Sequence, residues 1–235
     1  MDSTAASHAF PCETCPVRDE SICSALTNEE LKVLNAITTA VNLSPNEVVF
    51  YEEDDNTYLF NVVSGAVRLS KLLPDGRRQI TGFLFPGDFL GLSIADTYAY
   101  TAEAVRNTSL CRFNRAKLIK LLERFPKLER RLLELASNEI VEAQAHMLVL
   151  GCKTATEKLV STIMTLSERI GRTSNGGTVI ELPMTREDLA DYLGLSTETV
   201  SRTLSELRKE GVLELPAARK IHVAEPEKLA IFAGD

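Results

Sequence analysis

Three cysteines stand close together near the start of the chain, in the stretch PCETCPVRDESIC, with the spacing Cys12-x2-Cys15-x7-Cys23. Cysteine thiolates bind zinc and iron–sulfur clusters, and a site made of cysteines alone uses four of them. Two further cysteines could supply the fourth thiolate, Cys111 in the stretch SLCRF and Cys152 in LGCKTA. The residue types therefore predict a metal centre, with disulfide bonds or a thiol redox pair at Cys12 and Cys15 as alternatives.

The composition is that of a soluble globular chain of 235 residues, of which 44% are hydrophobic and 25% are charged. The first ten residues, MDSTAASHAF, lack the basic and apolar parts of a secretory signal, and no apolar run is long enough to span a membrane. We therefore expect a cytoplasmic protein, in which structural disulfides are rare. This favours metal binding or redox chemistry for the clustered cysteines. The net charge of −7 excludes a globally basic nucleic-acid-binding protein, so a contact with DNA would come from one dedicated element.

The elements that would position the cysteines follow from the apolar pattern and the turn signals. Thr27 and Glu30 have the spacing of a capping box, which predicts a helix within residues 27–44. Over residues 46–115 short apolar runs alternate with turn residues, as in an antiparallel β-roll, and one hairpin turns at residues 74–76. We expect an α+β protein in four parts: a cysteine-bearing segment 1–26, a β-roll sensor domain 27–125, a long helix 126–152, and a C-terminal domain 153–235.

Residues 126–150 have the pattern of one long helix that begins at Pro126. Its apolar residues recur alternately three and four positions apart, which is the heptad pattern of helices that associate side by side. Small alanines among larger apolar residues, with charged flanks, favour a seam between two copies. The alternative is a helix that packs only on its own domain. We predict a homodimer with a seam of six residues: Leu133, Ala136, Ile140, Ala143, Met147 and Leu150.

The stretch MTREDLADYLGLSTETVSRTLSELRKEGVLEL predicts two short helices joined by a tight turn at Gly194. Thr185 can cap the first helix and Ser196 the second. In the second helix the apolar residues Val200, Leu204 and Leu207 share one face, which predicts that this face is buried. Helix, glycine-bearing turn and helix is the layout of a helix-turn-helix, whose second helix enters the major groove of DNA.

The opposite face of that second helix carries side chains that can read bases. An arginine such as Arg202 can donate two hydrogen bonds to guanine, and a carboxylate such as Glu198 can accept from cytosine. The two are one turn apart, so Glu198 could orient Arg202; the alternative is a surface ion pair of little consequence. After the helix, GVLELPAARKIHV predicts a hairpin with basic residues at its tip, placed to contact phosphates. The predicted DNA-binding residues are Thr185, Thr197, Glu198, Ser201, Arg202, Ser205, Arg219 and Lys220.

On these motifs the whole chain resembles the Crp–Fnr family of bacterial transcription regulators. The run TREDLADYLGLSTETVSRTLSELRKEGVL is close to the family's DNA-binding signature, and Glu198, Ser201 and Arg202 match the Glu-x-x-Ser-Arg pattern of the Fnr branch. The resemblance implies a sensor β-roll of the cyclic-nucleotide-binding type, a dimerisation helix and a winged helix-turn-helix. It also implies a palindromic DNA site of the TTGAT–N4–ATCAA type, RNA polymerase as a partner, and activation or repression of anaerobic or microaerobic genes.

The resemblance also bears on what the sensor domain binds. In the branch that binds cyclic AMP, a glycine-glutamate turn is followed by an arginine-serine pair, whereas here Asp88 replaces the glutamate and no such pair follows. We therefore expect no cyclic AMP. In Fnr-type oxygen sensors three N-terminal cysteines and one on a late strand hold a [4Fe–4S] cluster, and the x2-x7 spacing resembles the variant branch called FnrN or FnrL. By this resemblance the ligands of one cluster per chain are Cys12, Cys15, Cys23 and Cys111, and Cys152 is left over. We expect Cys152 to be an ordinary small buried residue.

The expected mechanism is that an intact cluster ties the N-terminal segment to the β-roll and favours dimerisation, whereas oxygen removes the cluster and weakens the seam. Glu134, Glu139 and Glu142 make the long helix acidic, and repulsion at Glu142 could hold the cluster-free form near dissociation. Three alternatives remain: a zinc site, a metal-independent FixK-like regulator or thiol redox switch, and a cysteine-based redox enzyme. No nucleophile–base pair or phosphate-cradling glycine-rich loop supports an enzyme, so we expect none.

Overall fold

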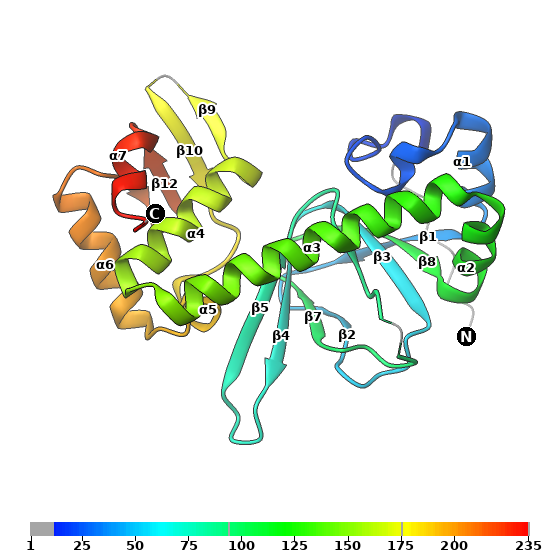
Figure 1. Ribbon diagram of the computed structural model, residues 1–235, viewed down its shortest axis with the longest axis horizontal. Helices are drawn as coiled ribbons and strands as arrows, with labels where there is room; N and C mark the ends of the chain where they lie inside the picture. The colour runs from blue at the N-terminus through cyan, green and yellow to red at the C-terminus, as the bar shows by residue number, and fades with distance from the viewer. Residues whose placement is uncertain (1–11, 94, 175, 235) are drawn as a thin grey trace. The chain divides into compact units, whose positions relative to one another are not determined.

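The computed structural model describes residues 12–93, 95–174 and 176–234. Part of the predicted segment 1–26, residues 1–11, therefore lies outside the described residues. The chain divides into two compact units, one made of the chain up to residue 71 and residues 81–140, the other of residues 72–80 and 141–235. The long helix α3 (Pro126–Cys152) contributes to both units and confirms the predicted helix (Figure 1). No helix among the described residues is long and apolar enough to cross a membrane.

The β-roll consists of two antiparallel four-stranded sheets, which confirms the predicted α+β class. One sheet has the strand order β1-β8-β3-β6 and the other β2-β7-β4-β5. The predicted hairpin at residues 74–76 joins β4 to β5. The strands of the roll are β1 (Thr38–Leu43), β2 (Val48–Phe50), β3 (Tyr58–Ser64), β4 (Val67–Leu72), β5 (Arg78–Leu84), β6 (Phe89–Leu90), β7 (Thr101–Ala104) and β8 (Thr108–Asn114).

The helix predicted within residues 27–44 is shorter than that range. Helix α1 (Asn28–Asn35) begins at the predicted capping box, in which Thr27 and Glu30 exchange hydrogen bonds, but residues 38–43 form β1. The change occurs at Thr38 and Thr39, whose β-branched side chains favour strands over helices. Strand β1 matters for the site because it lies beside β8.

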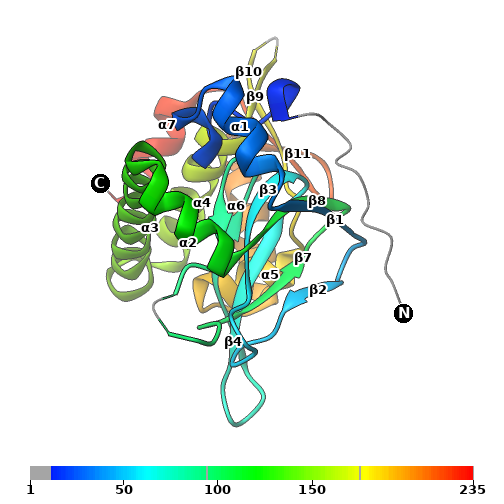
Figure 2. The same ribbon diagram turned by 90° about the vertical axis from the view of Figure 1, so that its right-hand side faces the viewer.

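A hydrophobic core joins the cysteine-bearing segment to the roll and its helices. Ile22 and Leu26, which flank Cys23, are buried together with Phe113 of β8. Helix α2 (Arg115–Arg124) and the first turn of α3 complete this core, and α1, α2 and α3 lie on the same side of the sheet that contains β8 (Figure 2). The segment is therefore held against the sheet by burial of apolar side chains, a contribution of about 1.5–3 kcal/mol for each large one.

Aromatic side chains fill the interior of the roll. The rings of Phe50 and Tyr98 stack with centroids 3.7 Å apart, and Phe60 and Tyr100 lie within 5.8 Å of Phe50. The hydroxyl of Tyr98 donates to the Tyr58 carbonyl at 2.7 Å. These side chains form part of the hydrophobic core of the roll.

The C-terminal unit contains a helix-turn-helix and a small antiparallel sheet. The buried residues Val200, Leu204 and Leu207 confirm the predicted inward face of the second helix. The sheet has the strand order β11-β12-β10-β9. The elements are α4 (Ala155–Ile170), β9 (Arg172–Ser174), β10 (Gly177–Glu181), α5 (Arg186–Leu193), α6 (Thr197–Lys209), β11 (Glu214–Ala217), β12 (Lys220–Val223) and α7 (Pro226–Ile231).

Candidate metal centre and DNA-binding element

The cysteine-bearing segment has a defined backbone. Cys12 opens the short helix η1 (Cys12–Thr14), and Cys23 lies in η2 (Ile22–Ala25). The Ser21 hydroxyl oxygen accepts from the Cys23 backbone N–H at 3.2 Å and caps η2. The Arg18 guanidinium donates to the Leu26 carbonyl at 3.2 Å. These contacts hold the three thiols on a folded loop.

Cys111 lies in the middle of the sheet that faces this loop. In the register of the strands, Cys111 of β8 is opposite Ala40 of β1 on one side and Asn61 of β3 on the other. Directly opposite residues share a face of a sheet, so these three side chains point to the same side. The structure therefore confirms that Cys111 lies on a late strand of the roll, β8.

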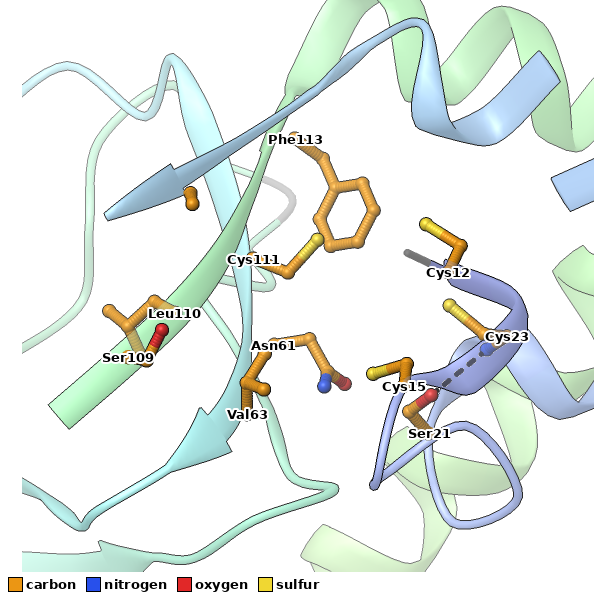
Figure 3. Close-up of a pocket in the computed structure, with 11 residues that line it drawn as sticks. Cys12, Cys15, Ser21, Cys23, Asn61, Val63, Ser109, Leu110, Cys111 and Phe113 are labelled. Carbon is orange, nitrogen blue, oxygen red and sulfur yellow. Dashed lines mark hydrogen bonds between the residues drawn. The ribbon is translucent and has the colours of Figure 1, made fainter. Parts of the chain in front are cut away.

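The four cysteines predicted as ligands line one pocket. Figure 3 shows their sulfur atoms pointing into the space between the loop and β8. No carboxylate or imidazole belongs to the described residues that line it. The lining residues other than the cysteines are Ser21, Ala40, Asn61, Val63, Ser109, Leu110 and Phe113.

The surroundings of Cys12, Cys23 and Cys111 favour the protonated form of these three thiols. Burial raises the pKa of Cys23 to about 11, and burial also raises the pKa of Cys12 and of Cys111. The neighbouring cysteines raise all three pKa values further, because thiolates so close together repel one another. Redox-active cysteines instead have lowered pKa values. Binding of a metal would require these thiols to lose their protons.

The residues present fit a group held by four thiolates. The donors are all soft sulfur ligands, and the walls are largely apolar. Over residues 12–93, 95–174 and 176–234, no three His, Cys, Asp or Glu side chains converge as the ligands of one ion would.

The expectation that Cys152 is buried is wrong. It lies at the C-terminal end of α3 and is exposed, and it does not belong to the residues that line the pocket. Helix ends leave their last residues without the next turn to cover them, so a small apolar residue there need not be buried.

The helix-turn-helix has the predicted geometry. Helices α5 and α6 are joined at Gly194, whose φ of 61° is the left-handed conformation that favours glycine. The Thr185 hydroxyl oxygen accepts from the Asp188 N–H at 3.0 Å and donates to its carboxylate at 2.8 Å. The Ser196 hydroxyl accepts from the Thr199 N–H at 3.1 Å. Both predicted caps are confirmed, and the hydroxyl of Thr185 is engaged in its cap.

The outward face of α6 presents Glu198 and Arg202 to solvent, with Ser201 and Ser205 half-buried. The pairing expected between Glu198 and Arg202 is not the one the structure has. The Arg202 guanidinium lies 4.0 Å from the Glu206 carboxylate, one turn in the other direction. This leaves the Glu198 carboxylate at the N-terminal turn, where the helix dipole favours an acidic side chain.

Sequence reasoning missed Arg186. Its guanidinium, at the start of α5, donates to the Ser201 hydroxyl at 3.2 Å and so fixes the orientation of a predicted DNA-contacting residue. The Ser205 hydroxyl donates to the Ser201 carbonyl at 2.9 Å. The sequence did contain a signal for this contact, since Arg186 is a basic residue directly after Thr185, the cap of the first helix.

The predicted hairpin after α6 is formed by β11 and β12, which meet at Ala218 and Arg219. The Arg219 guanidinium donates to the Pro183 carbonyl at 3.4 Å, and the Lys220 ammonium lies 3.8 Å from the Glu181 carboxylate. Both are weak contacts, so neither fixes the side chain away from a phosphate. Their role in DNA binding stays a prediction, as does that of Thr197.

The predicted dimer seam is an uncovered apolar stripe on α3. Leu133, Ile140 and Met147 are seven residues apart and 60–67% exposed. Val141 and Leu148, which sequence reasoning missed, are each 63% exposed and widen the stripe. Of the other predicted members Ala143 is exposed, whereas Ala136 and Leu150 are half-buried.

The acidic residues of α3 have partners within the chain. The Glu142 carboxylate lies 3.2 Å from the Arg169 guanidinium of α4, and Glu134 lies 3.4 Å from Arg131. A carboxylate already paired with a guanidinium contributes less repulsion across a seam. Glu142 is therefore a weaker source of dimer repulsion than the sequence suggested.

A β-roll, a long helix with an uncovered apolar stripe and a winged helix-turn-helix define a DNA-binding transcription regulator rather than an enzyme. Residues 157–232 match the model of the Crp-like helix-turn-helix domain, and residues 40–125 match that of the cyclic nucleotide-binding domain. The chain belongs to the Crp–Fnr family of transcription regulators.

Three relatives illustrate the similarity. The nitrogen fixation regulation protein FixK of Bradyrhizobium diazoefficiens is 41% identical over 87% of this chain and 86% of its own. The transcriptional activator protein FnrL of Cereibacter sphaeroides is 36% identical over 95% of this chain and 92% of its own. The solved structure of FixK2 from Bradyrhizobium japonicum has a TM-score of 0.78 at 37% identity, covering 83% of this chain and 97% of that one.

Proposed function

We propose that this protein is an oxygen-responsive dimeric regulator in which Cys12, Cys15, Cys23 and Cys111 hold one [4Fe–4S] cluster per chain. The observation that carries the proposal is that these four thiols, three from a loop and one from the central strand β8, line one pocket free of other metal-binding side chains among the described residues. When bound, the cluster would supply an oxygen-labile link between loop and sheet.

The contacts of Arg131 indicate how the state of the loop could reach the dimer helix. This α3 guanidinium donates to the Glu20 carbonyl at 2.9 Å and to the Ser21 carbonyl at 3.4 Å. It therefore binds the backbone between Cys15 and Cys23. Glu134 accepts from the same guanidinium at 3.4 Å, two residues from the apolar stripe at Ala136. A loop held by its thiols presents these carbonyls in one place, whereas a released loop does not.

The remaining chain would turn dimerisation into DNA binding. Two copies joined along the α3 stripe present two α6 helices, which suits a palindrome of the TTGAT–N4–ATCAA type. Monomers present one helix each and lose most of the affinity. We place the protein in the cytoplasm, with RNA polymerase as its partner at promoters that it activates or represses. Asp88 stands where the cyclic AMP-binding branch has a glutamate, and no arginine-serine pair follows it, which supports a regulator that does not use cyclic AMP.

Anaerobic purification tests this function. The expected protein is brown, absorbs near ~400 nm, contains about four irons per chain, and bleaches in air. It should bind a TTGAT–N4–ATCAA duplex before exposure to air and bind it much more weakly afterwards. A colourless protein with one zinc per chain and the same DNA affinity in air would contradict the proposal.

A second candidate function is a regulator whose DNA binding does not depend on a cluster. This chain is 41% identical to FixK and 36% identical to FnrL. The higher identity to FixK favours the second candidate, because the metal-independent alternative is the FixK-like one. Such a protein would bind the same duplex equally well with and without air. The experiment above therefore separates the two candidates.

Replacing Arg202 by alanine should weaken binding to the palindrome and relax the preference for its guanine. A guanidinium that contacts guanine contributes about 1–3 kcal/mol of discrimination, and a dimer makes the contact twice. Fluorescence anisotropy with the TTGAT duplex and with a duplex altered at the guanine measures both effects. Arg208→Ala, also exposed and basic but on the last turn of α6, is the control. Equal losses for both variants on both duplexes would mean that Arg202 contributes only charge.

Replacing Arg131 by alanine should leave the cluster in place and uncouple it from dimerisation. Couplings of this kind are about 1–3 kcal/mol, so the ratio of dimer dissociation constants with and without cluster should fall from about 5–150 toward one. Analytical ultracentrifugation measures this ratio. The neighbouring Arg130 also lies near Glu134, at 3.5 Å, and has no hydrogen bond or ion pair with the described residues of the loop, which makes Arg130→Ala the matched control. An unchanged ratio in Arg131→Ala would remove this residue from the coupling.

A further inference from the structure

The buried side chain of Asn61 is a polar residue in an apolar setting. Alternate residues of a strand face opposite sides, and in β3 the neighbours Phe60 and Val62 belong to the aromatic interior of the roll. Asn61 therefore faces the other side, between Leu59, which is buried in the core beneath the cysteine segment, and Val63, which lines the pocket. Only 2% of its surface is exposed. An asparagine here costs stability unless its amide has partners.

The amide of Asn61 is only partly satisfied within the chain. Its Nδ2 atom donates to the Val62 carbonyl at 3.1 Å. Oδ1 is buried without a partner among the described residues. An amide nitrogen carries two N–H donors, so one N–H also remains after the bond to Val62. A sulfur atom can accept from this second N–H but cannot pair Oδ1, because Oδ1 is itself an acceptor. The second N–H is therefore what Asn61 can offer to a sulfur-ligated group.

Asn61 borders the cysteine site. Asn61 is the direct cross-strand neighbour of Cys111, and such residues have Cβ atoms about 4.5–5.5 Å apart. Figure 3 shows the amide pointing into the pocket on the side of Cys15. The sulfur atoms of a thiolate-bound cluster accept hydrogen bonds, and such bonds raise its reduction potential. A neutral amide supplies this donor without adding a charge.

We propose that Asn61 positions a hydrogen bond on the sulfur of Cys111, or on the group that Cys111 binds, and thereby slows its oxidation in air. The inference rests on the proposed function, because it requires a sulfur-ligated group in the pocket. In that state Asn61 acts through the sulfur and is not itself a ligand. Its second N–H is the donor, whereas the first stays with Val62.

A matched control is available within the same roll. Asn56 is 4% exposed, donates through Nδ2 to the Gly91 carbonyl at 2.9 Å and, like Asn61, has a buried Oδ1 without a partner in the described part of the chain. It does not line the cysteine pocket. Replacing either asparagine by leucine therefore removes a similar buried amide, but only one of the two changes faces the cysteines.

The test compares Asn61→Leu, Asn61→Ser and Asn56→Leu with the unaltered protein after anaerobic loading. Iron content and absorbance report loading, electrochemical titration gives the midpoint potential, and the decay of the ~400 nm band in air gives the lifetime. We expect Asn61→Leu to load normally, to have a lower midpoint potential, and to lose its cluster about tenfold faster. Asn61→Ser, which keeps a donor, should fall between, and Asn56→Leu should match the unaltered protein.

Each other result counts against the inference. Equal potentials and lifetimes for Asn61→Leu and the unaltered protein would overturn it, and so would an equal change in Asn56→Leu. Failure of both Asn61 variants to load, with normal loading of Asn56→Leu, would assign Asn61 to assembly of the site and also overturn it. Absence of a cluster from the unaltered protein would contradict the proposed function itself, in a measurement that involves no variant.

Discussion

Changing Cys111 to alanine is expected to abolish both the chromophore and oxygen-dependent DNA binding. The loop would still offer three thiols, but the thiol that β8 contributes from the sheet would be missing. Three thiolates leave one iron of a four-iron cluster without its cysteine. The anaerobically purified variant should therefore be colourless, and its affinity for the TTGAT–N4–ATCAA duplex should equal that of the air-exposed protein.

Cys152→Ala is the control for this experiment, because Cys152 is exposed at the end of α3 and does not line the pocket. It should keep its colour and its response to air. Urea unfolding of the metal-free forms shows whether Cys111→Ala is folded. Since the change removes a single half-buried sulfur, a loss of about 1 kcal/mol is expected. A brown, oxygen-responsive Cys111→Ala protein would mean that the fourth ligand is another group. Loss of colour in Cys152→Ala alone would point to Cys152.

Features set by neighbours in sequence could be predicted. The capping boxes at Thr27 and Thr185 and the glycine turn at Gly194 each depend on residues a few positions apart, and the structure has all of them. The strand β1 was missed because the apolar residues of α1 continue into it, although Thr38 and Thr39 signal the change. Local pattern thus predicts where elements begin better than where they end.

Contacts that involve the backbone could not be predicted in this way. Arg131 donates to the carbonyls of Glu20 and Ser21. Because every residue has a backbone carbonyl, the residue types do not indicate which carbonyls Arg131 contacts. The pairing of Asn61 with Cys111 depends on the register of two strands about 50 residues apart in sequence, and a shift of one residue would turn Asn61 to the opposite face. Only the asparagine inside the apolar run YLFNVV gave a signal that the position is unusual.

The uncovered stripe on α3 has a consequence that can be measured on DNA. Ile140 is 60% exposed in the single chain, at the centre of the stripe, seven residues from both Leu133 and Met147. Replacing it by glutamate should leave the fold of one chain unchanged, because a carboxylate on an exposed helix position is well hydrated. In a dimer the same two carboxylates would face each other across an apolar seam, and an unpaired buried charge costs at least ~3 kcal/mol.

Ile140→Glu is therefore expected to be monomeric at concentrations where the unaltered, cluster-loaded protein is dimeric, and to bind the palindrome at least ~100-fold more weakly. Ile231→Glu is the control, since Ile231 is 79% exposed on α7, away from the stripe in sequence. Light scattering gives the oligomeric state, anisotropy gives the affinity, and circular dichroism shows that both variants are folded. Because Ile140 does not line the cysteine pocket, Ile140→Glu should keep the chromophore while it loses DNA binding. A regulator that binds DNA without dimerising would instead keep both. A brown, dimeric Ile140→Glu protein with normal affinity would show that α3 does not form the interface.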